Sequence, residues 1–179
     1  MTPMQAGGAG AVPTGGAATP PAGEAGAVPV GAAVAVQERG PETVPADHLD
    51  LLTRPICGVL TTMGPDGQPQ SSLVWADYDG DCARVNTTLE RQKGRNLRAN
   101  PRVSLLVVDP DDTGRFIQIR GEAELVTQGA LEHLDTLTRA YTRHPRYYGF
   151  IHPLEQAGRE TRVICRIHAR RITLDAIHA

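Results

Sequence analysis

Three cationic side chains, Arg91, Lys93 and Arg95, stand at alternate positions of one short segment. Cations this close together can hold a phosphate or a similar anionic group. The same charges could also do no more than solvate an exposed helix. Ligand binding is favoured by the place of the segment, because it connects two predicted strands of a small barrel.

The cationic segment is predicted to begin a helix. Thr87 and Glu90 have the Thr-x-x-Glu spacing of a capping box, which puts the helix N-terminus at about Thr88. Such an end offers free backbone N–H groups and the positive end of the helix dipole, so it can hold a phosphate. Pro101 stops the helix and begins an apolar run, Val103–Val108, that is predicted to be a buried strand.

Two aromatic features could belong to a binding site. Trp75, the only tryptophan, lies in a predicted strand and is either a core or interface aromatic or the wall of a ligand pocket. Tyr147, Tyr148 and Phe150 form the densest aromatic cluster, in a loop bounded by Pro and Gly. We expect this loop either to roof a substrate pocket or to pack in a dimer interface.

No side-chain constellation for catalysis or metal binding stands out. Ser71-Ser72 lacks a Gly-x-Ser-x-Gly elbow, and the histidines have no motif partner, so we expect them to be surface or structural residues. Cys57, Cys82 and Cys165 lack any CxxC spacing and are predicted to be buried free thiols in a reducing cytoplasm. This pattern is consistent with a cofactor that carries the reactive chemistry.

The elements that must position these residues are mostly strands. Alternating apolar residues and turn signals predict strands at Ile56–Thr62, Pro69–Tyr78, Cys82–Thr87, Val103–Val108, Phe116–Leu125 and Arg162–His168. A slip in the alternation near Arg170-Arg171 indicates a bulge. A meander of six or so antiparallel strands predicts a mainly β (α+β) fold, a small closed barrel with short flanking helices.

Two helices are expected beside the one that carries the cations. One spans residues 45–52 and can lay Leu49 and Leu52 on the barrel. The other runs from about Gly129 to Thr142, and its inward residues are predicted to be Leu131, Leu134, Leu137 and Tyr141.

Composition separates a tail from one domain. Residues 1–42, rich in Ala, Gly and Pro, are predicted to be a disordered tail, and residues 43–179 a single domain. The net charge of -2 gives no sign of a nucleic-acid partner, and no run is long enough to span a membrane. We expect a cytoplasmic protein, and the abundance of Ala, Gly, Pro and Arg suits an actinobacterial coding sequence.

The central segment resembles a known signature. Asn86-Thr87, Lys93-Gly94-Arg95-Asn96-Leu97 and Asn100-Pro101 are similar to the pattern of the split β-barrel flavin and deazaflavin oxidoreductases, the pyridoxamine-phosphate-oxidase-like superfamily. The match is closest to the branch that depends on coenzyme F420, and Val74-Trp75 and Gln118–Gly121 agree with it. The resemblance implies an FMN-binding split-barrel type of fold and a homodimer whose subunits share the active site.

The resemblance also implies an activity and a set of residues. The protein would transfer hydride from reduced F420 to an electron-poor small molecule such as an enone, a quinone or a tetrapyrrole, with no catalytic side chain. Arg91 and Lys93 would hold the phosphate, and Gln118 or Arg120 would come from the second subunit. The full set of implied cofactor-binding residues is Ser72, Val74, Trp75, Asn86, Thr87, Thr88, Arg91, Gln92, Lys93, Arg95, Asn96, Gln118 and Arg120.

Two other functions remain open on the sequence. An FMN-binding reductase or oxidase of the same fold is one, although Ser71 and Ala76 stand where the FMN oxidases carry phosphate-binding cations. A non-catalytic protein that binds the deazaflavin or a hydrophobic ligand is the other.

Overall fold

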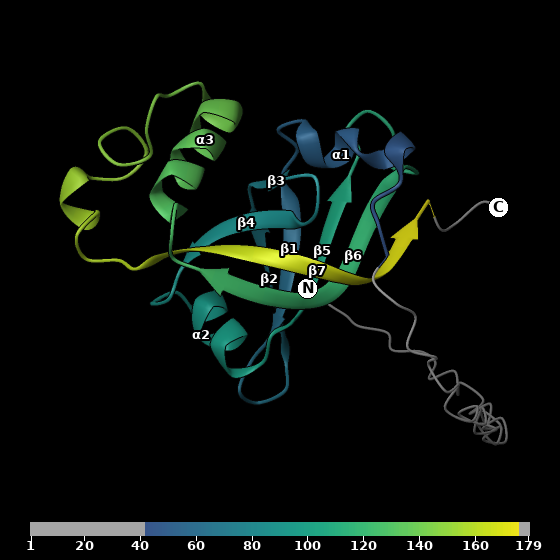
Figure 1. Cartoon of the computed structure of the whole chain (residues 1–179), viewed down its shortest axis with the longest axis horizontal. Helices are drawn as coiled ribbons and strands as arrows, with labels where there is room; N and C mark the ends of the chain where they lie inside the picture. Colours follow the sequence, from purple (N-terminus) through teal and green to yellow (C-terminus); the bar gives the residue numbers. More distant parts are fainter. Residues whose placement is uncertain (1–41, 176–179) are drawn as a thin grey trace, which may run out of the picture. The chain divides into compact units, whose positions relative to one another are not determined.

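The computed structural model describes residues 42–175, so the predicted disordered tail lies outside the described residues except for Glu42. Figure 1 shows the arrangement of the elements. The strands are β1 (Gly58–Met63), β2 (Pro69–Val74), β3 (Ala76–Tyr78), β4 (Ala83–Thr88), β5 (Arg102–Val108), β6 (Phe116–Val126) and β7 (Arg162–Leu174). The helices are η1 (Ala46–His48), α1 (Asp50–Thr53), α2 (Gln92–Ala99), α3 (Ala130–Thr142) and η2 (Leu154–Gln156).

All seven strands form one antiparallel sheet in the order β2-β1-β5-β6-β7-β4-β3. The two edge strands, β2 and β3, are separated in sequence by Trp75 alone. Because the chain passes from one edge of the sheet to the other at this residue, the sheet has to curl round. The predicted mainly β split-barrel fold is therefore confirmed.

Alternate residues of the strands fill the interior of the curled sheet. Leu60, Leu105, Ile119 and Ile167 are almost completely buried, and they come from four different strands. Such alternation is expected when one face of a sheet is covered and the other meets solvent. The ends of the described chain are held together as well, since the carboxylate of Glu42 accepts a hydrogen bond from the backbone N–H of Ile172.

A bulge interrupts the pairing of β6 with β7, as the sequence predicted. The register shifts at Arg120 and Gly121, which lie opposite Arg171 and Ala169, so Arg170 is the extra residue. Glycine is required at position 121 because a Cβ there would lie 2.0 Å from the carbonyl oxygen of His168.

Several local predictions were wrong. The predicted strand Pro69–Tyr78 is divided at Trp75, because its two halves pair with different neighbours. Leu131 is 45% exposed and does not face the core. Cys57 is exposed, whereas Cys82 and Cys165 are buried free thiols.

Helix α2 does not begin at the predicted capping box. It starts at Gln92, and its N-cap residue is Arg91, with no side-chain cap. The Glu90 carboxylate accepts hydrogen bonds from the backbone N–H of Thr161 instead of turning back to Thr87. A long-range contact therefore replaces the local one that the spacing suggested.

Candidate functional site

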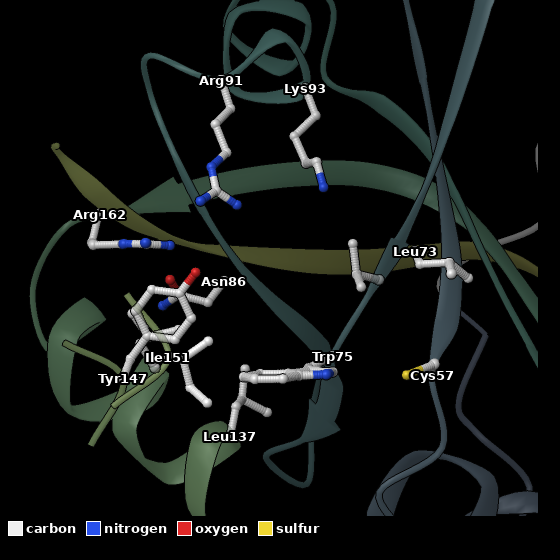
Figure 2. A pocket seen from close by; sticks show the side chains of 12 residues that line it. Cys57, Leu73, Trp75, Asn86, Arg91, Lys93, Leu137, Tyr147, Ile151 and Arg162 are labelled. Atoms are coloured by element: carbon white, nitrogen blue, oxygen red, sulfur yellow. The ribbon is translucent and has the colours of Figure 1, made fainter. Parts of the chain in front are cut away.

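A cavity of about 220 Å³ lies between the start of α2, the middle of α3 and the β2–β3 junction. We call it the Trp75 cavity. Figure 2 shows Arg91 and Lys93 extending into it from one side and Trp75 and Leu137 on the opposite side. Its lining comes from separate parts of the chain: Cys57, Leu73, Val74, Trp75, Asn86, Arg91, Lys93, Leu134, Leu137, Tyr147, Ile151 and Arg162.

The cationic side of the cavity depends on how α2 meets β4. Thr88 accepts a hydrogen bond through its Oγ1 from the backbone N–H of Arg91, at 3.2 Å, which fixes the turn into the helix. A Cβ at Gly94 would lie 2.0 Å from the carbonyl oxygen of Thr88, so only glycine lets α2 approach this turn so closely. Arg91 and Lys93 are thereby held at the mouth of the cavity.

Neither of these two cations forms an ion pair with a carboxylate within the described range 42–175. Lys93 is half-buried, and burial, followed by the charge of Arg91, lowers the pKa of its ammonium group. An anion placed between the two side chains would relieve both effects. The arrangement therefore favours binding of a phosphate or carboxylate at this end.

Arg162, the third cation of the cavity, is already neutralised. It forms an ion pair of 2.8 Å with Glu160 and donates a hydrogen bond to the hydroxyl of Tyr148. Its guanidinium group also lies over the ring of Tyr147, 4.8 Å from the centroid. Arg162 thus orders the aromatic loop that joins α3 to β7, and the excess positive charge belongs to Arg91 and Lys93.

Trp75 has a fixed orientation at the apolar side. Its ring stacks on Tyr141 at 5.3 Å between centroids and meets the edge of Tyr147 at 6.4 Å. The Tyr141 hydroxyl can donate to the carbonyl oxygen of Ile56 or of Ala76, and it accepts from the backbone N–H of Ala76. Burial raises the pKa of Tyr141 to about 12, so the hydroxyl stays protonated and keeps these contacts.

The aromatic cluster predicted in the α3–β7 loop is divided among three environments. Tyr147 lines the Trp75 cavity, and Tyr148 is buried behind it and donates to Glu160. Phe150 is half exposed and stacks on His144 outside the cavity. Of the three residues, Tyr147 alone contributes to the cavity wall.

The structure brings five of the residues implied by the resemblance into the Trp75 cavity: Val74, Trp75, Asn86, Arg91 and Lys93. The others lie elsewhere in the described chain: Ser72, Thr87, Thr88, Gln92, Arg95, Asn96, Gln118 and Arg120. Asn96 is a buried residue of α2, and its side-chain amide donates to Thr62 and Gln70. Arg95 braces the start of the helix by donating to the Glu90 carbonyl and to Gln92.

Gln118 and Arg120 of the same chain are also outside the cavity. Gln118 donates to Ser104 on the neighbouring strand, and Arg120 is exposed, on the side of β6 opposite to the core residues Ile117 and Ile119. Within one chain, these two residues therefore do not meet Trp75 or Lys93.

Sequence reasoning missed several residues of the cavity wall, among them Cys57, Leu73, Ile151 and Arg162. A signal existed for Arg162, which stands at the start of a predicted strand; in the structure it pairs in register with Thr88. Leu73 and Ile151 carried no such signal, because their place depends on how the β2–β3 junction and the α3–β7 loop come together.

The described part of the chain contains no cluster of His, Cys, Asp and Glu that could hold a metal ion. Among its helices, none has the length and apolar character needed to cross a membrane.

This chain is similar in sequence and structure to several known proteins. Residues 44–174 match the family described as pyridoxamine 5'-phosphate oxidase. An F420 reductase is similar to the chain at 34% identity and a TM-score of 0.62, over 73% of this chain and 98% of that one.

Two further solved structures show the same fold. A conserved hypothetical protein from Mycobacterium tuberculosis is 32% identical at a TM-score of 0.57, over 77% of this chain and 88% of that one. HupZ from Group A Streptococcus, 18% identical at a TM-score of 0.54, covers 74% of this chain and 94% of its own, and shares the fold alone. The chain thus belongs to the pyridoxamine 5'-phosphate oxidase family.

Proposed function

We propose that the protein is a cytoplasmic oxidoreductase that binds coenzyme F420 in the Trp75 cavity and reduces an electron-poor small molecule. The observation that carries the proposal is the pair of cations, Arg91 and Lys93, which lack carboxylate partners within residues 42–175 and face an apolar wall that contains Trp75. The 34% identity to an F420 reductase supports the choice of cofactor.

The residues of the cavity fit such a group. Arg91 and Lys93 would hold its phosphate, while Trp75, Leu134 and Leu137 would exclude water from the ring. When bound in its reduced form, the deazaflavin supplies a hydride to an enone, a quinone or a tetrapyrrole. Among the described residues, those that line the cavity include no carboxylate and no histidine, so solvent or a bound water would provide the proton.

A second copy of the chain would complete the site. The cavity of about 220 Å³ is smaller than the roughly 300–1,000 Å³ typical of pockets for drug-sized ligands. Leu73, on its wall, is 75% exposed, and Ile151 is 42% exposed. A homodimer would cover both apolar side chains and enlarge the enclosed volume, which supports the proposal of a shared active site.

The alternative cofactor is FMN, which the family match also favours. Its phosphate would lack two of the cations that the resemblance associates with FMN oxidases. Ser71 is engaged with Thr61 through their hydroxyl groups, and Ala76 is buried. These two positions therefore support the deazaflavin over FMN.

The test is a titration of the purified protein with both cofactors. We expect the deazaflavin to bind at least about tenfold more tightly than FMN, because the two cations remain while the other phosphate contacts are absent. Equal affinities, or FMN that copurifies at full occupancy, would show that the assignment is wrong. Binding without turnover of any enone, quinone or tetrapyrrole would favour a non-catalytic binding protein.

A further inference from the structure

The side-chain amide of Asn86 has only one orientation that its neighbours permit. One of its two polar atoms lies 2.7 Å from the carbonyl oxygen of Ala130 on α3. A carbonyl oxygen can only accept a hydrogen bond, so this atom must be the amide nitrogen, Nδ2. The amide oxygen, Oδ1, therefore points away from Ala130.

A buried histidine supports the same orientation. Nδ1 of His133 lies 3.4 Å from Nδ2 of Asn86, and its Nε2 lies 3.1 Å from a carboxylate oxygen of Asp77. The arrangement is satisfied when Nε2 carries the proton and donates to Asp77, which leaves Nδ1 as an acceptor for Asn86. Both partners of this histidine, Asp77 and Asn86, are distant from it in the chain, so its spacing in the sequence does not reveal them.

The carboxylate of Asp77, which accepts the hydrogen bond from His133, is held in its ionised form by its neighbours. Two hydrogen bonds from Arg84, of 2.9 and 2.7 Å, hold its carboxylate. Burial acts to raise the pKa of Asp77, but the hydrogen bonds from His133 and Arg84 outweigh it, and the pKa is lowered. The order of contacts therefore runs from Arg84 through Asp77 and His133 to Asn86.

The amide oxygen of Asn86 is buried and has no hydrogen-bond partner within the described residues. Leaving such an acceptor without a partner costs free energy, and most buried polar atoms have one. Asn86 belongs to the wall of the Trp75 cavity, in the corner where Figure 2 shows Tyr147 and Arg162.

We infer that Oδ1 of Asn86 accepts a hydrogen bond from an N–H group of the bound ligand, and that His133 and Asp77 are positioning residues that keep this oxygen available. The inference deepens the proposed function and rests on it. A deazaflavin ring carries an imide N–H between two carbonyl groups, and so does FMN. The cavity thus offers an amide acceptor from β4 in addition to the two cations of α2, and a ligand with both an anionic group and an imide N–H could use both.

The decisive measurement compares the deazaflavin with an analogue methylated at the imide nitrogen. In the unmodified protein, we expect methylation to weaken binding by about tenfold or more, because the acceptor loses its donor. Asn86→Leu has a side chain of similar shape but no acceptor, so the deazaflavin and its methylated analogue should bind to this variant with similar affinity. Lys93→Ala serves as the control, since it should weaken both compounds equally. Equal discrimination in Asn86→Leu and the unmodified protein would overturn the inference.

Two variants at His133 test its positioning role. His133→Asn can place an oxygen near the position of Nδ1, so it should preserve the discrimination between the two compounds. His133→Leu removes the acceptor and should reduce the discrimination while leaving a folded protein. If both variants discriminate as well as the unmodified protein, His133 is only structural.

A spectroscopic measurement needs no variant and no ligand. Nitrogen NMR of the imidazole should show neutral His133 protonated on Nε2, and protonation on Nδ1 alone would overturn the inference. The assignment of the cofactor and the role of Asn86 can be tested separately. If FMN binds more tightly than the deazaflavin, the same comparison with FMN and its N-methylated form still tests Asn86, because the imide N–H is common to both rings.

Discussion

At the scale of single residues, Lys93 is placed where its charge opposes folding. Its pKa is lowered by burial and by the neighbouring charge of Arg91. A base whose pKa is lower in the folded state than in the unfolded state is destabilised in its charged form, so protonated Lys93 does not contribute to stability. A half-buried cation that destabilises the unliganded protein is typical of a ligand-binding site, because a bound anion stabilises its charged form.

We therefore expect Lys93→Ala to weaken cofactor binding without weakening the fold. Loss of a charge-assisted contact to phosphate should lower the affinity by about ten- to a hundredfold, which corresponds to roughly 1.5–3 kcal/mol. The melting temperature should stay the same or rise slightly. Fluorescence titration and thermal unfolding measure the two effects.

Arg98→Ala is the matched control, since Arg98 is an exposed cation of the same helix outside the cavity. It should change neither quantity. The pH dependence gives a second check: the contribution of Lys93 to cofactor affinity should begin to fall as the pH rises through the lowered pKa of the unliganded protein, below 10.5, and Lys93→Ala should lack this dependence. Unchanged binding together with a lower melting temperature would mean that Lys93 is structural.

At the scale of elements, local signals predicted where α2 ends better than where it begins. The chain leaves the helix at Asn100, before Pro101, as expected. The predicted start of the helix was wrong because the carboxylate of Glu90 accepts a hydrogen bond from Thr161, a residue 71 positions away. No local spacing reveals such a contact. The division of the strand at Trp75 escaped prediction for the same reason, since it depends on which strands lie beside each half.

Gly94 connects the position of α2 to the chemistry of the cavity. In an ordinary helix, replacing glycine by alanine improves stability, by about 0.5–1 kcal/mol. Here the new Cβ would meet the Thr88 carbonyl oxygen at 2.0 Å and the Leu89 Cα at 3.0 Å, so α2 would have to move. We expect Gly94→Ala to destabilise the protein by about 1–3 kcal/mol and to weaken cofactor binding. Denaturant unfolding and titration measure both.

The control for Gly94→Ala is Gly158→Ala, because a Cβ at Gly158 meets no atom within 4 Å. That variant should keep the stability and the affinity of the unmodified protein. A more stable Gly94→Ala protein with intact binding would show that the close approach of α2 to Thr88 is not required.

A second contact between elements should depend on pH. His48 of η1 bonds to Asp47 and to Asp175, just beyond β7. Burial acts to lower the pKa of His48, but these two carboxylates raise it above 6.5. The stabilisation is therefore complete below the unfolded-state pKa and is lost as the pH rises through the higher folded-state value.

His48→Gln should accordingly lower the melting temperature at about pH 6 more than at about pH 9. The carboxylates remain ionised at both values because their own pKa values are lowered. His144→Gln removes an exposed histidine that has no ion-pair partner in the described chain, and it should show no such difference. An equal loss of stability for His48→Gln at both pH values would contradict an electrostatic role.

At the scale of the whole molecule, the fold was more predictable than the composition of the site. Alternating apolar residues indicated the strands, and the slip near Arg170 indicated the bulge. The spacing of the cations also identified Arg91 and Lys93, which both line the Trp75 cavity, as candidate anion-binding residues. Tyr147 and Ile151 lie on the long connection between α3 and β7, and Arg162 begins β7. Tertiary packing sets the path of this connection, so the meeting of these residues with Trp75 could not be derived from spacing.

The exposed face of β6 is the surface through which a second subunit could complete the site. Arg120 is exposed on the side of β6 opposite to the core and does not line the Trp75 cavity of its own chain. We predict that an isologous dimer brings Gln118 or Arg120 of one subunit toward the ring held by Trp75 and Lys93 of the other. In a shared site of this kind, each pocket needs residues from both chains.

Subunit exchange between two impaired variants tests this arrangement. Lys93→Ala and Arg120→Ala should each reduce activity alone. In their heterodimer, one pocket contains both lesions and the other contains neither, so activity should recover toward about half of the unmodified value. The control mixes Lys93→Ala with Arg91→Ala, whose lesions belong to the same half of the site, so every pocket keeps one lesion and activity should not recover. If Arg120→Ala is fully active, or the first mixture recovers nothing despite verified exchange, the second subunit does not supply Arg120 to the site.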